Sequence, residues 1–123
     1  MEQDPLTGKV IGCAIEVHRL LGPGLLESTY QQCLARELAL HDIEFKLEHS
    51  LPIEYKGVLL DCGYRIDILI EDQLILELKA IEAVQGIHHA QLLTYMKLSG
   101  ITTGLLINFN TKVLKDGIKR FKL

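Results

Sequence analysis

Hydrophobic and polar residues alternate along residues 64–80, YRIDILIEDQLILELKA, in the pattern of two consecutive β-strands. Two apolar rows occupy every second position, and they are Ile66, Ile68 and Ile70, followed by Leu74, Leu76 and Leu78. Three charged residues interrupt this otherwise apolar stretch, namely Asp67, Glu77 and Lys79. A small domain that places two acids and a lysine within its most strand-like segment needs a chemical reason for doing so.

Helical spacing of apolar residues frames this segment on both sides. Residues 7–21 are predicted to form a helix with Thr7 as its N-cap, and Gly22-Pro23-Gly24 ends that helix. A second helix is expected over about residues 25–41. A third is expected over residues 86–99, with Gly100 as its C-terminal stop.

The remaining segments read as strands. Short strands are expected at 44–49 and 51–55, with a turn at Lys56-Gly57. Longer strands are expected at 58–70 and 73–80, a buried strand at 103–109, and a short strand or helix after Val113. This order of helix, about three antiparallel strands, helix and strand predicts a mixed α/β (α+β) fold rather than an alternating doubly wound sheet.

Composition predicts one globular domain over residues 1–123. Hydrophobic residues make up 48% and charged residues 24% of the 123 positions, as in chains that fold around a core. The formal net charge of −3 gives no overall basic footprint, which argues against tight non-specific DNA binding but leaves room for a local basic patch.

The cysteine pattern favours a reducing compartment. The cysteines at 13, 33 and 62 are odd in number and lack C-x-x-C spacing, so each is expected to be a small buried hydrophobe. The N-terminus does not resemble a signal peptide, and no 18-residue apolar stretch predicts a membrane span. We therefore expect a cytoplasmic protein that makes no membrane contact.

The apolar rows also predict how the two strands of residues 64–80 pair. Burying both rows on one face requires 70 opposite 74, 68 opposite 76 and 66 opposite 78, across the three-residue connection 71–73. Asp67 then lies opposite Glu77, with roughly 5 Å between their Cβ atoms, and Arg65 lies opposite Lys79. Two facing carboxylates repel each other unless a cation lies between them.

Carboxylate oxygens suit Mg²⁺, which takes one or two carboxylates and keeps waters for its substrate. A nearby lysine would orient a nucleophilic water or neutralise a phosphate in the transition state. The alternative is a solvated polar face on which Lys79 pairs with Glu77. Under the metal-site hypothesis, Arg65 is a candidate phosphate contact because of its place beside the site.

Asp67 followed by Glu77-Leu78-Lys79 resembles the PD-(D/E)XK nuclease superfamily, although Ile66 stands where that pattern has proline. Residues 24–30, GLLESTY, fit the motif of the GxxExxY family within that superfamily, and residues 103–109, TGLLINF, are similar to a strand of the same family. The resemblance covers roughly residues 8–123. It implies a restriction-endonuclease-like core and Mg²⁺ or Mn²⁺ as cofactor.

Site roles follow from this resemblance. It implies that Asp67, Glu77 and the backbone carbonyl of Leu78 hold the metal and that Lys79 acts on the water or phosphate. The resemblance also implies that Glu27, in the GLLESTY motif, joins the metal shell. The alternative is that Glu27, as an acid in the first turn of its helix, stabilises the helix dipole. Tyr30 shares a helix face with Glu27 and is a candidate substrate contact.

The later helix carries a further set on one face. His88, Gln91 and Tyr95 follow i, i+3 and i+7 spacing. The Q-x-x-x-Y spacing resembles the helix after the ExK motif in bacterial recombination helicase-nucleases, which implies that Gln91 orients the lysine or the water. Tyr95 and His88 are candidate substrate contacts, with packing at a polar helix edge as the alternative for both.

The resemblance implies metal-dependent hydrolysis of DNA phosphodiesters. Two alternatives stay open. One is an inactive nuclease-fold module that binds nucleic acid or a protein, which the net charge favours. The other is a structure-selective endonuclease similar to archaeal Holliday-junction resolvases. A homodimer is plausible in either active case, because a single small domain has little surface with which to hold DNA.

Overall fold

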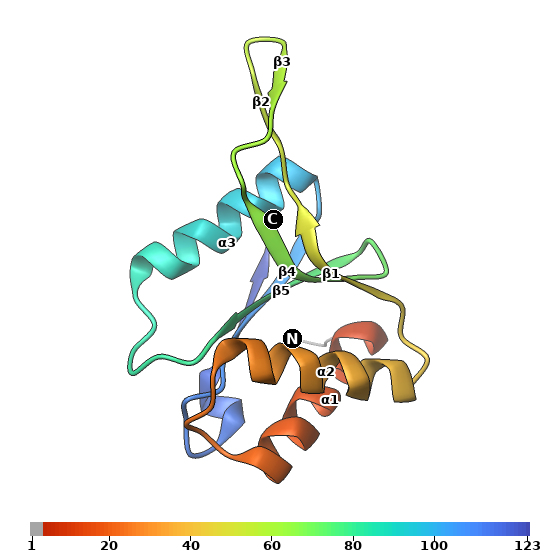
Figure 1. The fold of residues 1–123 in the computed structure, drawn as a ribbon, viewed down its shortest axis with the longest axis vertical. Coiled ribbons are helices and arrows are strands. Elements are labelled where there is room, and N and C mark those ends of the chain that lie inside the picture. The colour runs from red at the N-terminus through yellow and green to blue at the C-terminus, as the bar shows by residue number, and fades with distance from the viewer. Residues whose placement is uncertain (1–3) are drawn as a thin grey trace.

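The computed structural model describes residues 4–123 (Figure 1). Within that range the elements, in chain order, are α1 (Pro5–Leu21), α2 (Glu27–Leu40), β1 (Phe45–Ser50), β2 (Ile53–Tyr55), β3 (Val58–Leu60), β4 (Arg65–Ile70), β5 (Leu74–Lys79), α3 (Gly86–Ser99), β6 (Thr103–Asn108), the 3₁₀ turn η1 (Leu114–Gly117) and β7 (Ile118–Lys122). No helix among these described residues is long and apolar enough to cross a membrane.

One mixed sheet lies between two helical layers. Its strand order is β1-β4-β5-β6-β7, with β5 and β6 parallel and the other neighbours antiparallel. Helices α1 and α2 cover one face of the sheet and α3 covers the other (Figure 1). This architecture confirms the predicted α/β fold of helix, antiparallel strands, helix and strand.

Each face of the sheet has its own apolar core. The core between the sheet and helices α1 and α2 includes the buried side chains of Tyr30, Leu34, Ile68, Leu76, Leu78 and Phe109. The core between the sheet and α3 includes Ile66, Leu69, Ile75, Leu92, Tyr95, Met96 and Leu106. Because both faces of β4 and β5 are covered, these strands are apolar nearly throughout. Of their charged residues, Glu77 is buried, Asp67 and Lys79 are half-buried, and Arg65 is exposed.

Helix α1 begins before the predicted residue. Asp4 is its N-cap, and its carboxylate accepts hydrogen bonds from the Thr7 N–H and the Thr7 hydroxyl, each at 2.8 Å. Pro5 occupies the first turn, where its missing N–H costs nothing. The prediction that Thr7 caps this helix was therefore wrong, because an aspartate three residues earlier offers the stronger acceptor.

The predicted strand over 58–70 is two strands. β3 and β4 are separated by residues 61–64, where Gly63 has a φ of +83°. The expected Lys56-Gly57 turn is confirmed, with φ values of +48° and +84°, and it closes a β2–β3 hairpin. That hairpin projects from the sheet at the top of Figure 1. Cys62 lies exposed beside it, so the expectation that all three cysteines are buried was wrong.

The predicted register of β4 and β5 is confirmed over half of its length. Ile70 pairs with Leu74 and Ile68 with Leu76. The expected pairs 66–78, 67–77 and 65–79 are absent from the described chain, since the ladder ends at 68–76. Ile66 packs under α3, whereas Ile68 and Ile70 pack under α1 and α2. The strand therefore changes face at Asp67, between the two isoleucines.

Candidate metal and catalytic site

Asp67 lies where β4 and β5 separate. Its Oδ2 accepts a hydrogen bond from the backbone N–H of Leu78 at 2.8 Å. A strand N–H points in the plane of the sheet toward the neighbouring strand, so this carboxylate fills the gap that the ended ladder leaves. The sequence-predicted acid is thus anchored between the strands instead of standing on one face of them.

Strand β1 is irregular beside Asp67. Leu47 pairs with Ile68 and His49 with Ile66, while Glu48 between them has a φ of +49° and does not pair with Asp67 in the described sheet. The Asp67 carbonyl accepts a hydrogen bond from Gln31 Nε2 at 3.0 Å, and the same amide donates to Glu48 Oε2 at 3.3 Å. The Gln31 side chain of α2 therefore donates a hydrogen bond to the Asp67 carbonyl oxygen, which has no backbone partner in the described ladder with β1.

Glu77 is the most buried charged residue of the site. Only 5% of it is exposed, and its Oε1 has no hydrogen-bond partner among the described residues. Burial, and then the nearby Asp67 carboxylate, raise the pKa of Glu77 to about 8, against the opposing effect of Lys79. Burial also raises the pKa of Asp67 to about 6, with Glu48 and Glu27 adding to it. A cation between these two neighbouring carboxyls would hold both in their charged form.

Lys79 and Glu27 complete the group. The Lys79 ammonium lies close enough to lower the pKa of both Asp67 and Glu77. Glu27, at the start of α2, accepts a hydrogen bond from the Ala80 N–H at 3.3 Å, directly after Lys79. A cavity of about 130 Å³ opens there, and it is lined by Glu27, Ser28, Gln31, Glu48, Asp67 and Leu78. Of the four residues predicted from the sequence, Glu27 and Asp67 line this cavity, while Glu77 and Lys79 lie near Asp67 without lining it.

A family profile described as the PD-(D/E)XK nuclease superfamily matches residues 4–121. The chain belongs to the PD-(D/E)XK nuclease superfamily. No curated protein and no solved structure gives a significant match. The assignment of Asp67, Glu77 and Lys79 to the superfamily's metal and catalytic motif stays a prediction. The finer resemblance to the GxxExxY family stays a prediction.

Superfamily nucleases use divalent metals, and the residues present fit such an ion. The donors around the cavity are oxygens, which Mg²⁺ and Mn²⁺ prefer. The orphaned Glu77 Oε1 and the raised pKa values of Glu77 and Asp67, which burial causes first and neighbouring carboxylates second, mark carboxyls that are costly to ionise. A divalent cation would favour their charged form, so the donor set and the electrostatics agree.

Helix α3 contributes a second polar pair. Gln91 Nε2 donates to Tyr95 Oη at 3.0 Å. Burial raises the pKa of Tyr95, and the charges of Glu77 and Asp67 add to that effect, which places this pair beside the acids. The ring of Tyr64 meets that of Tyr95 edge-on at 6.1 Å. Gln91 and Tyr95 are thus brought to the site from the sheet face opposite α2.

Other sequence-predicted residues have different surroundings. Tyr30 is fully buried, stacks on Phe109 at 4.3 Å and donates its hydroxyl to the Gly22 carbonyl at 2.6 Å, so it offers no surface to a substrate. Its hydroxyl also accepts from the Leu25 N–H. Tyr30 therefore braces the α1–α2 loop that precedes Glu27.

His88 and Arg65 are likewise held by local partners. His88 Nδ1 accepts from the Gln85 N–H at 2.9 Å and so caps α3. Arg65 pairs with Ser50 of β1, and its guanidinium reaches Asp61 at 3.5 Å and the Tyr64 carbonyl at 2.9 Å. The predicted position of Arg65 opposite Lys79 was wrong, because β4 and β5 separate before that point.

Three residues of the site were missed by the sequence reasoning. Glu48, Gln31 and Ser28 line the cavity together with Asp67. Gln31 lies four residues after Glu27 and so shares its helix face, a signal that was available. Glu48 gave no such signal, since its place depends on a left-handed backbone that strand alternation does not predict.

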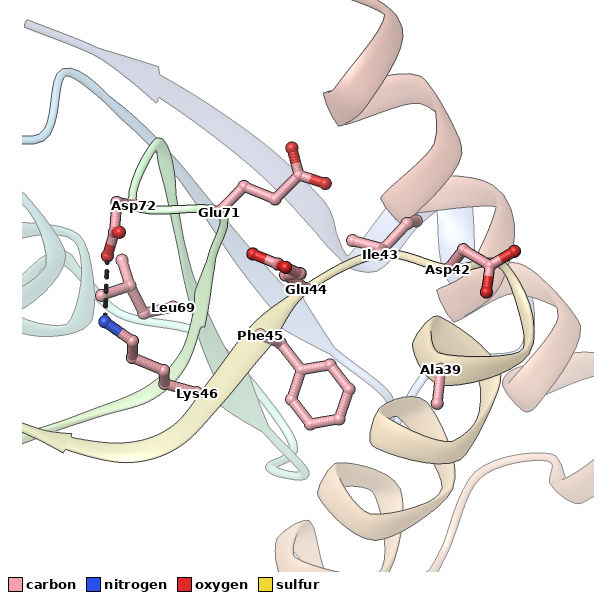
Figure 2. A pocket seen from close by; sticks show the side chains of 9 residues that line it. All are labelled: Ala39, Asp42, Ile43, Glu44, Phe45, Lys46, Leu69, Glu71 and Asp72. Carbon is pink, nitrogen blue, oxygen red and sulfur yellow. Dashed lines mark hydrogen bonds and ion pairs between the residues drawn. The ribbon is translucent and has the colours of Figure 1, made fainter.

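A larger hollow, of about 560 Å³, lies at the other end of β4, between the end of α2 and the β4–β5 turn (Figure 2). Four carboxylates line it, against one lysine, Lys46, which pairs with Asp72 at 3.4 Å. The acids are Asp42, Glu44, Glu71 and Asp72. None of these described lining residues has a buried carboxylate oxygen without a partner, so the small cavity beside Asp67, close to the orphaned Glu77 Oε1, is the better candidate for metal chemistry.

Proposed function

We propose that this protein is a metal-dependent nuclease that hydrolyses DNA phosphodiester bonds, with Mg²⁺ or Mn²⁺ as cofactor. The observation that carries the proposal is the buried Glu77 carboxyl, with an unpartnered oxygen, beside Asp67. A module kept only for its fold has no need to bury two carboxyls together, because each costs stability when it is charged.

Asp67, Glu77 and the Leu78 carbonyl would hold the ion, and Glu27 would join them directly or through water. The bound ion supplies Lewis-acid chemistry and lowers the pKa of a coordinated water. The Leu78 N–H already fixes the Asp67 carboxylate in place, and the Ala80 N–H does the same for Glu27. Such preorganised ligands need little rearrangement on binding.

Lys79 and α3 would act on the substrate and the attacking water. The ammonium of Lys79 stands near both acids, where it would stabilise the charge that develops on the phosphate. Gln91 would orient that lysine or the water, and Tyr95, its hydrogen-bond partner, would support it. Arg65 is proposed as a phosphate contact from the edge of the site, and exchange of its Asp61 partner for a phosphate would be required.

The test is cleavage of plasmid, single-stranded and four-way-junction DNA with Mg²⁺ or Mn²⁺. We expect the wild-type protein to cut, Asp67→Asn to abolish cutting, and Lys79→Met to slow it by about 10²–10³-fold, while circular dichroism shows an intact fold in both variants. Glu71→Gln is the matched control, since Glu71 is an exposed acid in the β4–β5 turn. Cleavage that survives both site variants would overturn the assignment.

The junction substrate separates a structure-selective enzyme from a general nuclease. Isothermal titration with Mn²⁺ separates an enzyme from an inactive module. An absence of Mn²⁺ binding to the wild-type protein would favour the inactive module.

We further propose that the chain belongs to the GxxExxY group of the superfamily. Its support is the motif over residues 24–30, two residues of which make contacts outside their own helix. Glu27 reaches the end of β5, and Tyr30 braces the preceding loop.

We also propose a homodimer formed through the β2–β3 hairpin. An isolated two-stranded ribbon is marginal in water, and this one exposes 55% of Val58, 68% of Leu59 and 42% of Leu60. The free edge of β3 carries no charge, whereas β2 has Glu54 at its centre. If the β3 strands of two copies paired antiparallel, centred on Leu59, apolar residues would face apolar residues and no like charges would meet.

Light scattering tests the dimer. Leu59→Glu is expected to give a monomer, whereas Leu26→Glu, at another exposed leucine, is expected to leave the dimer intact. A wild-type protein that stays monomeric at micromolar concentration, or a Leu59→Glu dimer, would rule this interface out.

A further inference from the structure

A second group of metal-binding side chains lies between α1 and α2, away from the nuclease site. Cys13 on α1 faces Glu37 and His41, which are four residues apart at the end of α2 and so share one face. One ligand atom from each, a thiol sulfur, a carboxylate oxygen and an imidazole nitrogen, lie within 4.8 Å of one another. We propose that these three residues form a site for Zn²⁺ or a similar transition metal.

The distances suit such an ion after a small contraction. An ion at the centre of a triangle with sides of 4.8 Å or less lies at most about 2.8 Å from each corner, whereas zinc bonds are about 2.0–2.3 Å long. Movements of roughly half an ångström would close the site. Three protein ligands leave a fourth position for water or for another side chain.

The donor types separate this site from the one at Asp67. Sulfur and imidazole nitrogen select zinc, cobalt and related ions, whereas Mg²⁺ takes oxygen ligands. Glu27 lies at the first turn of α2 and Glu37 lies ten residues further along, a distance of roughly 15 Å at 1.5 Å per residue. The two sites therefore differ in position as well as in chemistry.

His41 is already held in place for this role. Its Nδ1 contacts the Glu37 carbonyl at 2.9 Å and the Glu37 carboxylate at 3.4 Å. The ring is thereby fixed over the last turn of α2, beside the second ligand. The imidazole side chain is 54% exposed, so an ion can reach the group from solvent.

A fourth ligand is available on α1. Glu16 follows Cys13 by three residues, and it forms an ion pair with Arg19 at 2.8 Å. Its pKa is lowered mainly by Arg19 and in smaller part by His41, which places Glu16 near the imidazole. Release of Arg19 would let Glu16 complete a tetrahedral set that joins α1 to α2.

The alternative is that Cys13 is only a core residue, since it is 2% exposed and packs among apolar side chains. Burial, together with Glu37, raises the pKa of the Cys13 thiol. Metal binding must therefore displace a proton from this thiol, and affinity for the metal is expected to rise with pH.

Titration of the metal-free 123-residue chain with Co²⁺ tests the proposal, because a sulfur-to-cobalt absorption band reports a thiolate ligand that the Asp67 site lacks. We expect one equivalent of Co²⁺ to produce the band and Zn²⁺ to displace it. Cys13→Ser should abolish the band, and His41→Gln should weaken Co²⁺ binding at least tenfold. Asp67→Asn should leave the band unchanged, so that failure of the nuclease proposal and failure of this one are separable.

Cys33→Ser, Cys62→Ser and His49→Gln are the matched controls, and each should keep the band. His41 is exposed, so His41→Gln remains informative even where Cys13→Ser does not fold. No band in the wild-type protein, or a band lost in Cys62→Ser and kept in Cys13→Ser, would overturn the proposal.

Discussion

The Asp67 carboxylate and the Leu78 N–H are joined at 2.8 Å in the gap where β4 and β5 separate. This bond gives the acid a structural task besides its proposed chemical one. The substitution Asp67→Asn keeps an acceptor for the N–H, whereas Asp67→Ala leaves a part-buried donor unpaired at a cost of about 1–3 kcal/mol. In metal-free urea denaturation at neutral pH, Asp67→Ala should be less stable than Asp67→Asn by that amount.

Both variants should lose metal-dependent cleavage, because neither supplies a carboxylate to the ion. Equal stability of the two would show that the Leu78 N–H finds another partner, and it would remove the positioning role assigned to this bond.

The apolar rows predicted the β4–β5 register correctly as far as Ile68 and Leu76, because burial fixes which face each side chain takes. They failed beyond Asp67. There the strand changes face, and a carboxylate and a glutamine replace backbone partners. A hydrophobic pattern with a period of two residues cannot predict where side chains take the place of backbone hydrogen-bond partners. The departure from regular pairing falls at the proposed catalytic acid, as is common at functional sites.

The sequence predicts the acids and the lysine of the candidate site, but it predicts less of their surroundings. Asp67, Glu77 and Lys79 follow from the sequence pattern, and Glu27 follows from the resemblance. Tyr30 was interpreted as a substrate contact because it shares a helix face with Glu27. Its contacts with Phe109 and Gly22 are long-range ones, which no local spacing shows.

Stability of the metal-free protein should fall as pH rises. The folded-state pKa of Glu77 is about 8 against an ordinary 4.5, so the folded state binds more protons than the unfolded one between those values. The free energy of unfolding then decreases across that window, by an amount on the order of a few kcal/mol, and levels off above it. Denaturant midpoints measured from pH 4 to 9 without metal check this expectation.

Glu77→Gln removes the titrating group and should flatten most of this slope, leaving the smaller contribution of Asp67 between about pH 4 and 6. Saturating Mn²⁺ should stabilise the wild-type protein most above pH 8, where both acids are charged. A wild-type slope that Glu77→Gln leaves unchanged would assign the pH dependence to other groups.

Lys79→Met should separate catalysis from metal binding. The ammonium is proposed to stabilise charge on the phosphate, and loss of one such group typically lowers turnover by about 10²–10³-fold. The acids remain, so Mn²⁺ should still bind by calorimetry, at a pH high enough to ionise both of them. Lys46→Met, at an exposed lysine paired to Asp72, is the control and should cleave normally. Loss of Mn²⁺ binding in Lys79→Met would place the lysine in the support of the metal ligands instead.

Gly104 marks the close approach of α3 to β6. An added Cβ there would lie 2.8 Å from Met96 Sδ and 3.1 Å from Leu92 Cδ1, both fully buried. Gly104→Ala should therefore cost about 1–3 kcal/mol of stability through overpacking. Gly12→Ala, in α1 with nothing within 4 Å of the new Cβ, should instead stabilise by about 0.5–1 kcal/mol. Thermal unfolding of both variants checks the contrast, and a neutral Gly104→Ala would show that α3 shifts easily.

Tyr30→Phe tests whether this residue supports the loop or binds substrate. The change removes a hydroxyl that donates to the Gly22 carbonyl and accepts from the Leu25 N–H, while it keeps the stacking on Phe109. We expect a loss of about 1–2 kcal/mol in urea denaturation, because two part-buried backbone groups lose their partner. Since the ring lies fully buried, KM for DNA should not change at temperatures where the variant is folded. Tyr55→Phe, at an exposed tyrosine of the hairpin, should leave stability unchanged. A Tyr30→Phe protein of normal stability and raised KM would restore the substrate-binding role that its motif suggested.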